Sequence, residues 1–293
     1  MLEIHKYHAM GNDMLVIDPA TFSAELTPDL IRRLCHRNFG VGADGICYGP
    51  LPAAKPNLTM RFFNPDGSEA EKSGNGLRIF ARYLWDAGYV NGPAIPGPAI
   101  PGSARYSPFT MYINNEPILT TIEDDTATTI TTALGRLSFS TPLAPDSLRE
   151  ILGVLLTPNE IAAGATAVNI GNPHCVLFIE SVTAERARQI GPLLETADPF
   201  PNRTNVQLVQ VIDPHTIQIE IWERGAGYTL ASGTSATAAA GAAIYTHRCQ
   251  SPVRVQMAGG SAAVTVSGDW SAALTGTVQP VFSGVLAQSF LLS

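Results

Sequence analysis

The sequence predicts a mixed α/β (α+β) protein that contains two related domains. Its 293 residues are enough for two domains of ordinary size. Short runs rich in β-branched and aromatic residues outnumber the helical segments, which favours a sheet-rich fold. Two helices are expected directly after Ser-Gly turns, at Ser73-Gly74 and Ser232-Gly233, about half the chain apart. This spacing indicates an internal repeat and therefore two similar domains.

The remaining elements follow from local patterns. Strands are predicted where apolar or β-branched residues recur, over residues 60–63, 127–132, 206–212, 217–222 and 253–257. One helix is expected to begin at Thr27-Pro28, a cap followed by proline at the first helical position, and to run toward Asn38. Two more helices are expected after Ser147 and over residues 183–190.

The two helices that follow the Ser-Gly turns differ in composition. The first is expected to end at Ala87-Gly88, with Leu77, Phe80, Ala81 and Leu84 on one face. The second, over residues 236–244, consists almost entirely of small residues. A helix with small residues on every side suits close wrapping by other elements, so we expect it to be buried all round.

Composition excludes several classes of protein. Eighteen Lys+Arg against 25 Asp+Glu give a net charge of −7, which argues against a surface for nucleic acid or anionic membrane. No apolar run reaches the length of a membrane span, and the first residues lack a signal pattern, so a cytoplasmic protein is expected. Four scattered cysteines, expected to be buried, indicate neither a metal site nor a disulfide framework: Cys35, Cys47, Cys175 and Cys249. The Pro-Ala-Ile-Pro-Gly repeat of residues 92–102 is predicted to be an exposed loop.

Motifs for nucleotides, zinc hydrolysis and the serine-hydrolase elbow are missing from the sequence. The two glycine-flanked helix starts instead suggest a site for a small carboxylate, because free backbone N–H groups at a helix N-terminus attract anions. Serine is also an ordinary N-cap, so each turn alone has a purely structural interpretation. Arg224 could bind a carboxylate through two parallel hydrogen bonds, and several asparagines beside turns could bind an ammonium or carboxylate group. Together these residues favour a zwitterionic amino acid as the ligand.

Five motifs across nearly the whole chain resemble those of diaminopimelate epimerase, in the family of amino-acid racemases that work without pyridoxal phosphate. They are K-Y-H-A-M-G-N-D at residues 6–13, R-N-F-G-V-G-A-D-G at 37–45, N-P-D-G-S-E-A at 64–70, G-N-P-H at 171–174 and E-R-G-A-G at 223–227. The resemblance implies two similar domains, each with a mostly antiparallel sheet wrapped around a central helix, and an active site in the cleft between them. It places residues 1–122 and 280–293 in the N-terminal domain and 123–279 in the C-terminal domain.

The resemblance also implies a reaction that needs no cofactor. One thiolate removes the α-proton of the amino acid, and a thiol on the opposite face returns a proton, so that LL- and meso-diaminopimelate interconvert, a step of lysine biosynthesis. The implied partner is a small zwitterionic amino acid, with no nucleic acid, membrane or metal, and the chain is expected to form a homodimer. By match, the substrate would be held by Asn12, Asn64, Gly74, Asn75, Asn172, Asn205, Glu223, Arg224, Gly233 and Thr234.

Both proton-transfer positions depart from the family. The family has cysteine in E-x-C-G-N-G and L-A-C-G-T, and this chain has Ser73 and Ser232 there. A thiol titrates near ~8.5 and a helix N-terminus lowers its pKa further, whereas a hydroxyl resembles water, near ~15.7. A difference of roughly 7 pKa units corresponds to about 10 kcal/mol, so we expect this form to be inactive or nearly so. Asp44 and His174 are the other candidate bases, although His174 is expected to be a hydrogen-bonded structural residue.

Two explanations remain open. Either both cysteines were deliberately replaced by serine, or the chain is a natural relative that isomerises another small acid or only binds an amino acid. Tyr228 favours the second, because the family usually has glutamate there (E-R-G-x-G-E-T). With Asp44, Tyr228 is therefore a candidate modulator of the substrate.

Overall fold

The computed structural model describes residues 2–52, 57–70, 72–90 and 106–291, and the chain divides into two compact units. Unit 1 comprises residues 1–133 and 275–293, and unit 2 comprises residues 134–274. The unit boundaries therefore differ by up to eleven residues from the domain boundaries expected from the sequence. The Pro-Ala-Ile-Pro-Gly repeat at 92–102 lies outside the described residues. No helix in the described part of the chain is long and apolar enough to cross a membrane.

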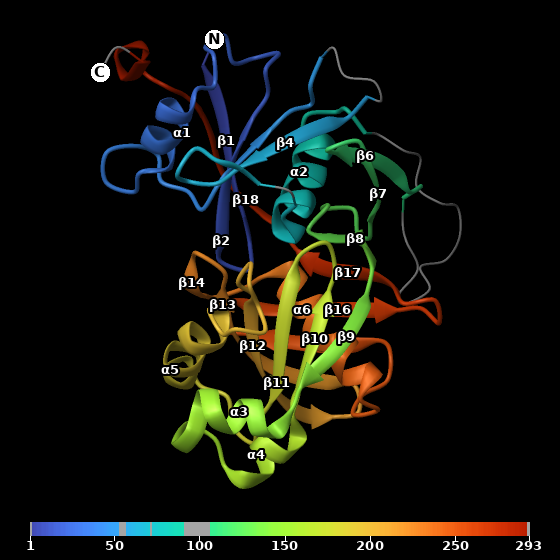
Figure 1. Cartoon of the computed structure of the whole chain (residues 1–293). Coiled ribbons are helices and arrows are strands. Elements are labelled where there is room, and N and C mark those ends of the chain that lie inside the picture. The colour runs from blue at the N-terminus through green and yellow to red at the C-terminus, as the bar shows by residue number, and fades with distance from the viewer. Residues whose placement is uncertain (1, 53–56, 71, 91–105, 292–293) are drawn as a thin grey trace. The chain divides into compact units, whose positions relative to one another are not determined.

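Unit 1 consists of a mixed sheet around one long helix (Figure 1). Its elements are β1 (Glu3–Ala9), β2 (Asn12–Ile17), α1 (Pro28–Cys35), β3 (Ile46–Tyr48), β4 (Thr59–Phe63), β5 (Glu69–Ala70), α2 (Gly74–Asp86), β6 (Phe109–Ile113), β7 (Glu116–Ile122), β8 (Thr129–Arg136), β18 (Gln279–Val285) and the short 3₁₀ helix η2 (Gln288–Leu291). Helix α2 packs against β1, β2 and β3. The predicted face of Leu77, Phe80, Ala81 and Leu84 is fully buried.

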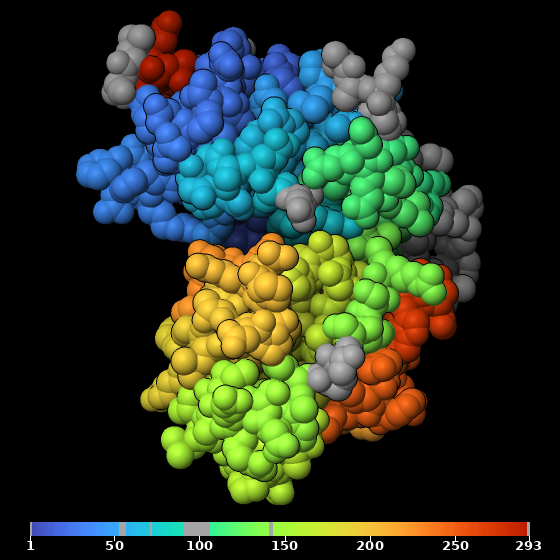
Figure 2. Space-filling view, viewed as in Figure 1, coloured from blue at the N-terminus to red at the C-terminus, as the bar shows by residue number. Residues whose placement is uncertain are grey.

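Unit 2 repeats this plan with further helices on its outer surface. Its elements are β9 (Ser138–Leu143), α3 (Pro145–Leu152), η1 (Gly153–Leu155), α4 (Pro158–Ala163), β10 (Ala165–Asn169), β11 (Pro173–Phe178), α5 (Ala184–Glu195), β12 (Asn205–Asp213), β13 (Thr216–Glu223), β14 (Gly227–Thr229), α6 (Gly233–Tyr245), β15 (Val253–Met257), β16 (Gly260–Val266) and β17 (Ser271–Thr277). Helices α3 and α4, in yellow-green, lie on the surface of the unit (Figure 2). Helix α6 is buried from Gly233 through Ala243, as its small residues predict.

The order of strand pairing is the same in both units. In unit 1, β1 pairs antiparallel with β2, β2 parallel with β3, β3 antiparallel with β4, β4 parallel with β6, and β6 antiparallel with β7. In unit 2, β10, β11, β12, β13, β15 and β16 pair in that order with the same directions. Parallel neighbouring strands need a crossover connection. In unit 1, α1 lies between β2 and β3 along the chain, and α2 lies between β4 and β6. In unit 2, α5 lies between β11 and β12, and α6 lies between β13 and β15. Ser73 and Ser232 therefore precede equivalent helices, and the internal repeat predicted from the sequence is confirmed.

Several predicted helix boundaries are wrong. Helix α5 ends at Glu195 rather than at Ile190, and α6 begins at Gly233 rather than at Ala236. Helix α1 ends at Cys35 rather than near Asn38, because His36 is extended and its Nδ1 accepts the N–H groups of Asn38 and Phe39. Helix α3 begins at Pro145, not after Ser147, with proline at the first helical position. The short helix α4 was not predicted, although the capping box of Thr157 and Glu160 is a recognisable sequence signal.

Candidate functional site

The N-terminus of α2 is built around Ser73. The Ser73 Oγ accepts a hydrogen bond of 3.1 Å from the Gly76 N–H, so this hydroxyl acts as the N-cap of the helix. A Cβ on Gly76 would lie 3.2 Å from the Ser73 Cβ and 3.3 Å from the Met14 Sδ, so glycine permits this close packing. Gly74 and Asn75 are buried, while Ser73 itself is half-buried.

The N-terminus of α6 has the same construction around Ser232. The Ser232 Oγ accepts from the Ser235 N–H at 3.5 Å and lies 3.5 Å from the Thr234 Oγ1. Ser232, Gly233 and Thr234 are buried. The Gln207 amide donates to the Ser235 Oγ at 3.0 Å and ties the first turn of the helix to β12. The two serines thus play the same capping role in equivalent helices.

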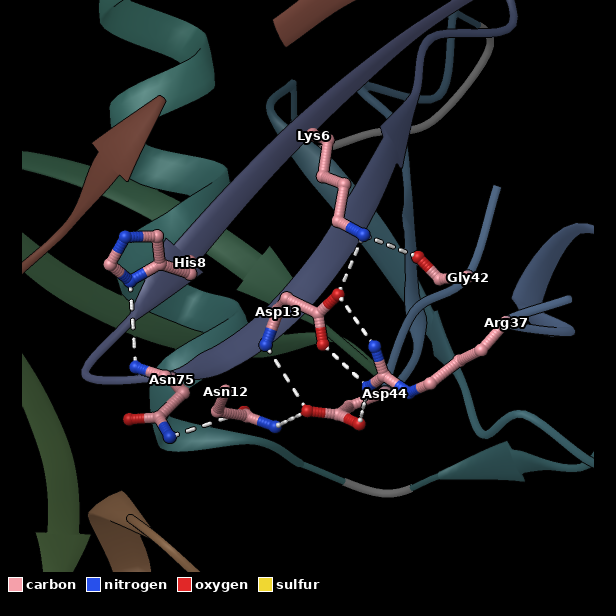
Figure 3. Close-up of polar contacts among 9 residues, drawn as sticks. Lys6, His8, Asn12, Asp13, Arg37, Gly42, Asp44 and Asn75 are labelled. Carbon is pink, nitrogen blue, oxygen red and sulfur yellow. Dashed lines mark hydrogen bonds and ion pairs between the residues drawn. The ribbon is translucent and has the colours of Figure 1, made fainter. Parts of the chain in front are cut away.

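Asn12 lies in a network of charged side chains in unit 1 (Figure 3). Its amide nitrogen donates to the Asp44 Oδ2 at 3.0 Å, and its carbonyl oxygen accepts from the Asn75 Nδ2 at 3.2 Å. Arg37 forms ion pairs with Asp13 and with Asp44. The network therefore brings together three of the residues predicted from the sequence, Asn12, Asp44 and Asn75.

The pKa values of the two carboxyl groups in this network are shifted in opposite directions. Burial would raise the pKa of Asp13, but hydrogen bonds from Arg37 and Lys6 outweigh it and bring the pKa to about 2. Burial, together with the neighbouring charge of Asp13, raises the pKa of Asp44. Lys6 also donates to the Gly42 carbonyl at 2.7 Å, which attaches the loop before Asp44 to β1.

Asn64 lies at the end of β4 in a separate turn. Its amide nitrogen donates to the Ser68 Oγ at 3.0 Å, and its backbone N–H donates to the Ser68 carbonyl at 2.8 Å. In the sheet of unit 2, the equivalent position is Glu223, because Phe63 and Trp222 hold matching places in the two registers. Both residues therefore begin the turn that follows their strand.

In unit 2, Asn205 joins two of the predicted motifs. Its Nδ2 donates to the Pro173 carbonyl at 2.9 Å, and its Oδ1 accepts from the Arg224 N–H at 3.0 Å. The side chain is buried. Asn205 thus holds the turn at Asn172-Pro173 beside the Glu223-Arg224 turn. The guanidinium of Arg224 itself is exposed and contacts the Asn202 carbonyl at 3.4 Å.

Glu195 is a supporting residue that the sequence did not reveal. This buried carboxylate accepts from the Trp222 Nε1 at 2.7 Å and from the Gly225 N–H at 3.0 Å. It thereby fixes both sides of the Glu223-Arg224 turn from the end of α5. Glu195 is 28 residues from Glu223 and belongs to no motif, so no sequence signal indicates this role.

His174 and Tyr228 are each held by side-chain contacts within unit 2. His174 is completely buried, its Nε2 lies 2.9 Å from the Asn172 Oδ1, and burial lowers its pKa to about 3. The Tyr228 hydroxyl donates to the Glu220 carboxylate at 2.7 Å, and the Arg188 guanidinium lies over its ring at 4.2 Å. His174 is therefore the hydrogen-bonded residue expected from the sequence. The phenol of Tyr228 is held by residues of β13 and α5.

The sequences of both units match one family model. A family model described as diaminopimelate epimerase matches residues 4–139 and 166–281. The chain belongs to the diaminopimelate epimerase family. Its members are isomerases. The family resemblance, the isomerase class and the α+β fold expected from the sequence are thus confirmed.

Curated relatives match the chain along nearly its whole length. It is 44% identical over 289 residues to diaminopimelate epimerase 2 of Nostoc sp., covering 98% of this chain and 96% of that protein. It is 37% identical over 295 residues to diaminopimelate epimerase of Desulfitobacterium hafniense, covering 99% and 100%.

Solved structures of other proteins share the fold of this epimerase-family chain. A predicted epimerase from Pseudomonas aeruginosa has a TM-score of 0.75 at 17% identity, covering 98% of this chain and 100% of that one. A hydroxyproline epimerase from Agrobacterium vitis has a TM-score of 0.67 at 11% identity, covering 98% and 92%. At these identities the likeness concerns the fold alone.

Proposed function

We propose that this chain is a cofactor-independent diaminopimelate epimerase in which both proton-transfer positions carry serine, so that it binds diaminopimelate but epimerises it very slowly or not at all. The observation that carries the proposal is the shared role of Ser73 and Ser232. Each caps the central helix of its unit, and the two helices are equivalent in the strand order. A reaction with one proton-transfer group on each face of the substrate needs such a matched pair.

Substrate binding is proposed to use groups that the serines leave unchanged. The N–H groups at the starts of α2 and α6 would bind a carboxylate, with Asn12, Asn64 and Asn172 holding polar groups of the substrate. Arg224 is exposed and can form a bidentate pair with a second carboxylate. Diaminopimelate fits this set because it carries an ammonium and a carboxylate at each end.

Proton transfer is the step that the serines impair. Abstraction of an α-proton needs an anionic base. At ~1.4 kcal/mol per pKa unit, ionising a hydroxyl costs about 10 kcal/mol more than ionising a thiol. The partners of the Ser232 Oγ are the Thr234 hydroxyl and the Ser235 N–H. Neither is a base, so neither can accept the proton of Ser232. This observation also favours a second candidate, a non-catalytic amino-acid-binding protein on the same scaffold.

Binding is tested by isothermal titration calorimetry with meso-diaminopimelate. We expect saturable binding, about tenfold or more weaker in Arg224→Gln because a charge-assisted bidentate pair is lost. Arg149→Gln is the matched control, since Arg149 is an exposed arginine of α3 in the same unit. Absence of heat with the unaltered chain would contradict diaminopimelate as the ligand. Equal weakening in the control would contradict the role of Arg224.

A further inference from the structure

We propose that Asp44 and Arg78 are positioning residues that fix the orientation of the Asn12 carboxamide through a hydrogen-bond chain with a charge at each end. The inference rests on the proposed function, which places Asn12 against the substrate. Neither Asp44 nor Arg78 needs to touch the substrate in this role. Both act through the amides that lie between them.

The chain runs from Arg78 to Asp44 in a single direction. The Arg78 Nη2 donates to the Asn75 Oδ1, the Asn75 Nδ2 donates to the Asn12 Oδ1 at 3.2 Å, and the Asn12 Nδ2 donates to the Asp44 Oδ2 at 3.0 Å. Figure 3 shows the last two links together with the ion pairs around Asp44. Every link therefore joins a nitrogen donor to an oxygen acceptor.

The charged groups at the two ends do not allow the hydrogen bonds of this series to run in the opposite direction. An amide can rotate by 180° and exchange its oxygen and nitrogen, but a guanidinium can only donate and a carboxylate can only accept. Rotation of Asn75 would place its NH₂ group opposite the Arg78 guanidinium. Rotation of Asn12 would place its carbonyl oxygen opposite the Asp44 carboxylate. Each reversal replaces a hydrogen bond with a repulsive contact, so both amides are held in one orientation.

Both ends of the chain are anchored. Arg78 is completely buried in α2, and its Nη1 also donates to the Gly74 carbonyl at 3.0 Å. Asp44 accepts from the Asp13 N–H at 3.2 Å and is paired with Arg37. Because the Arg78 guanidinium and the Asp44 carboxylate are both held in place, they fix the orientation of the Asn75 and Asn12 amides between them.

The consequence for Asn12 is that it presents a donor. Its Nδ2 carries two hydrogens, and Asp44 takes one of them. The half-buried side chain can therefore offer the second N–H to a ligand, and an acceptor such as a carboxylate oxygen matches it. The hydrogen-bond chain from Arg78 to Asp44 thus favours a negatively charged or carbonyl group of the ligand beside the Asn12 Nδ2.

The proposal is tested by a double-mutant cycle on binding of meso-diaminopimelate, measured by calorimetry. Asp44→Asn removes the acceptor-only end, so we expect about a tenfold rise in Kd, the size of one charge-assisted hydrogen bond. In the Asn12→Ala background, Asp44→Asn should change Kd by less than about twofold, because Asp44 acts through Asn12. Additive losses would overturn the proposal. Asp29→Asn is the matched control, since it also removes an aspartate paired with an arginine, at an exposed place on α1.

Two further measurements keep the proposal testable. If Asp44→Asn does not fold, Arg37→Gln replaces it in the cycle, because Arg37 is exposed and anchors Asp44. In ¹⁵N spectra of the free chain, the Asn12 side-chain amide should show one hydrogen-bonded proton that is lost in Asp44→Asn or Arg37→Gln. A chain without affinity for diaminopimelate would contradict the proposed function. An Asn12 amide spectrum that neither variant alters would contradict the positioning role.

Discussion

Arg78 and Thr237 hold equivalent positions in the two central helices, and each donates to a carbonyl at the start of its own helix. The Arg78 Nη1 lies 3.0 Å from the Gly74 oxygen, and the Thr237 Oγ1 lies 2.8 Å from the Gly233 oxygen. Each residue is five positions after the capping serine. The arginine does more than the threonine, because its second nitrogen also contacts the Asn75 side chain.

Arg78→Lys should destabilise unit 1. One ammonium group cannot reproduce the two contacts that the planar guanidinium makes with Gly74 and Asn75. We expect the free energy of unfolding to fall by about 1–3 kcal/mol, measured by urea denaturation. Arg32→Lys, in a mostly exposed ion pair on α1, should change it by less than about 0.5 kcal/mol. An equal fall in the free energy of unfolding for both substitutions would show that the contacts of Arg78 with Gly74 and Asn75 do not stabilise unit 1.

His174 should make the fold sensitive to mild acid. Burial lowers its pKa to about 3, below the ordinary 6.5, so unfolding takes up a proton between these values. The corresponding stability is complete above pH 6.5 and is lost as the pH falls below it, by about 2 kcal/mol between pH 7 and 5. His174→Gln should flatten this part of the stability curve, and the exposed His247→Asn should leave it unchanged. The same slope in both variants would exclude His174 as its source.

Glu195→Gln should loosen the turn that carries Arg224. The carboxylate accepts from the Trp222 Nε1, the Gly225 N–H and, at 3.5 Å, the Arg203 guanidinium, and an amide would direct its own NH₂ group at one of these donors. We expect a loss of about 1–3 kcal/mol in urea unfolding, together with weaker binding of diaminopimelate. Glu185→Gln provides the comparison on the exposed face of the same helix. Unchanged stability and binding in Glu195→Gln would remove Glu195 from the support of this turn.

The central helices and several strands were predictable because their signals are local. The Ser-Gly turns mark where α2 and α6 begin, although α6 starts at Gly233, three residues before the predicted 236, and the predicted strand over residues 253–257 coincides with β15. The end of α1 was not predictable, since it depends on the conformation of His36 and on contacts of its ring with later N–H groups. The predicted burial of all four cysteines is confirmed.

The supporting contacts of the site were less predictable than its motifs. Asn12 and Asp44 belong to different motifs, and no sequence pattern shows that their side chains meet. Their hydrogen bond depends on β2 and β3 being parallel neighbours, which requires α1 to cross between them. Glu195 is even less predictable, because two of its donors, the Trp222 Nε1 and the Gly225 N–H, lie 27 and 30 residues further along the chain.

Incorporation of solvent deuterium at the α-carbon of diaminopimelate separates substrate binding from proton transfer. The unaltered chain, with Ser73 and Ser232, is predicted to show little or no incorporation. The double variant Ser73→Cys, Ser232→Cys is predicted to show rapid incorporation with interconversion of the LL and meso forms, and each single variant much less. Incorporation by the unaltered chain at the rate of the double variant, or none by a folded double variant that binds diaminopimelate, would contradict the account.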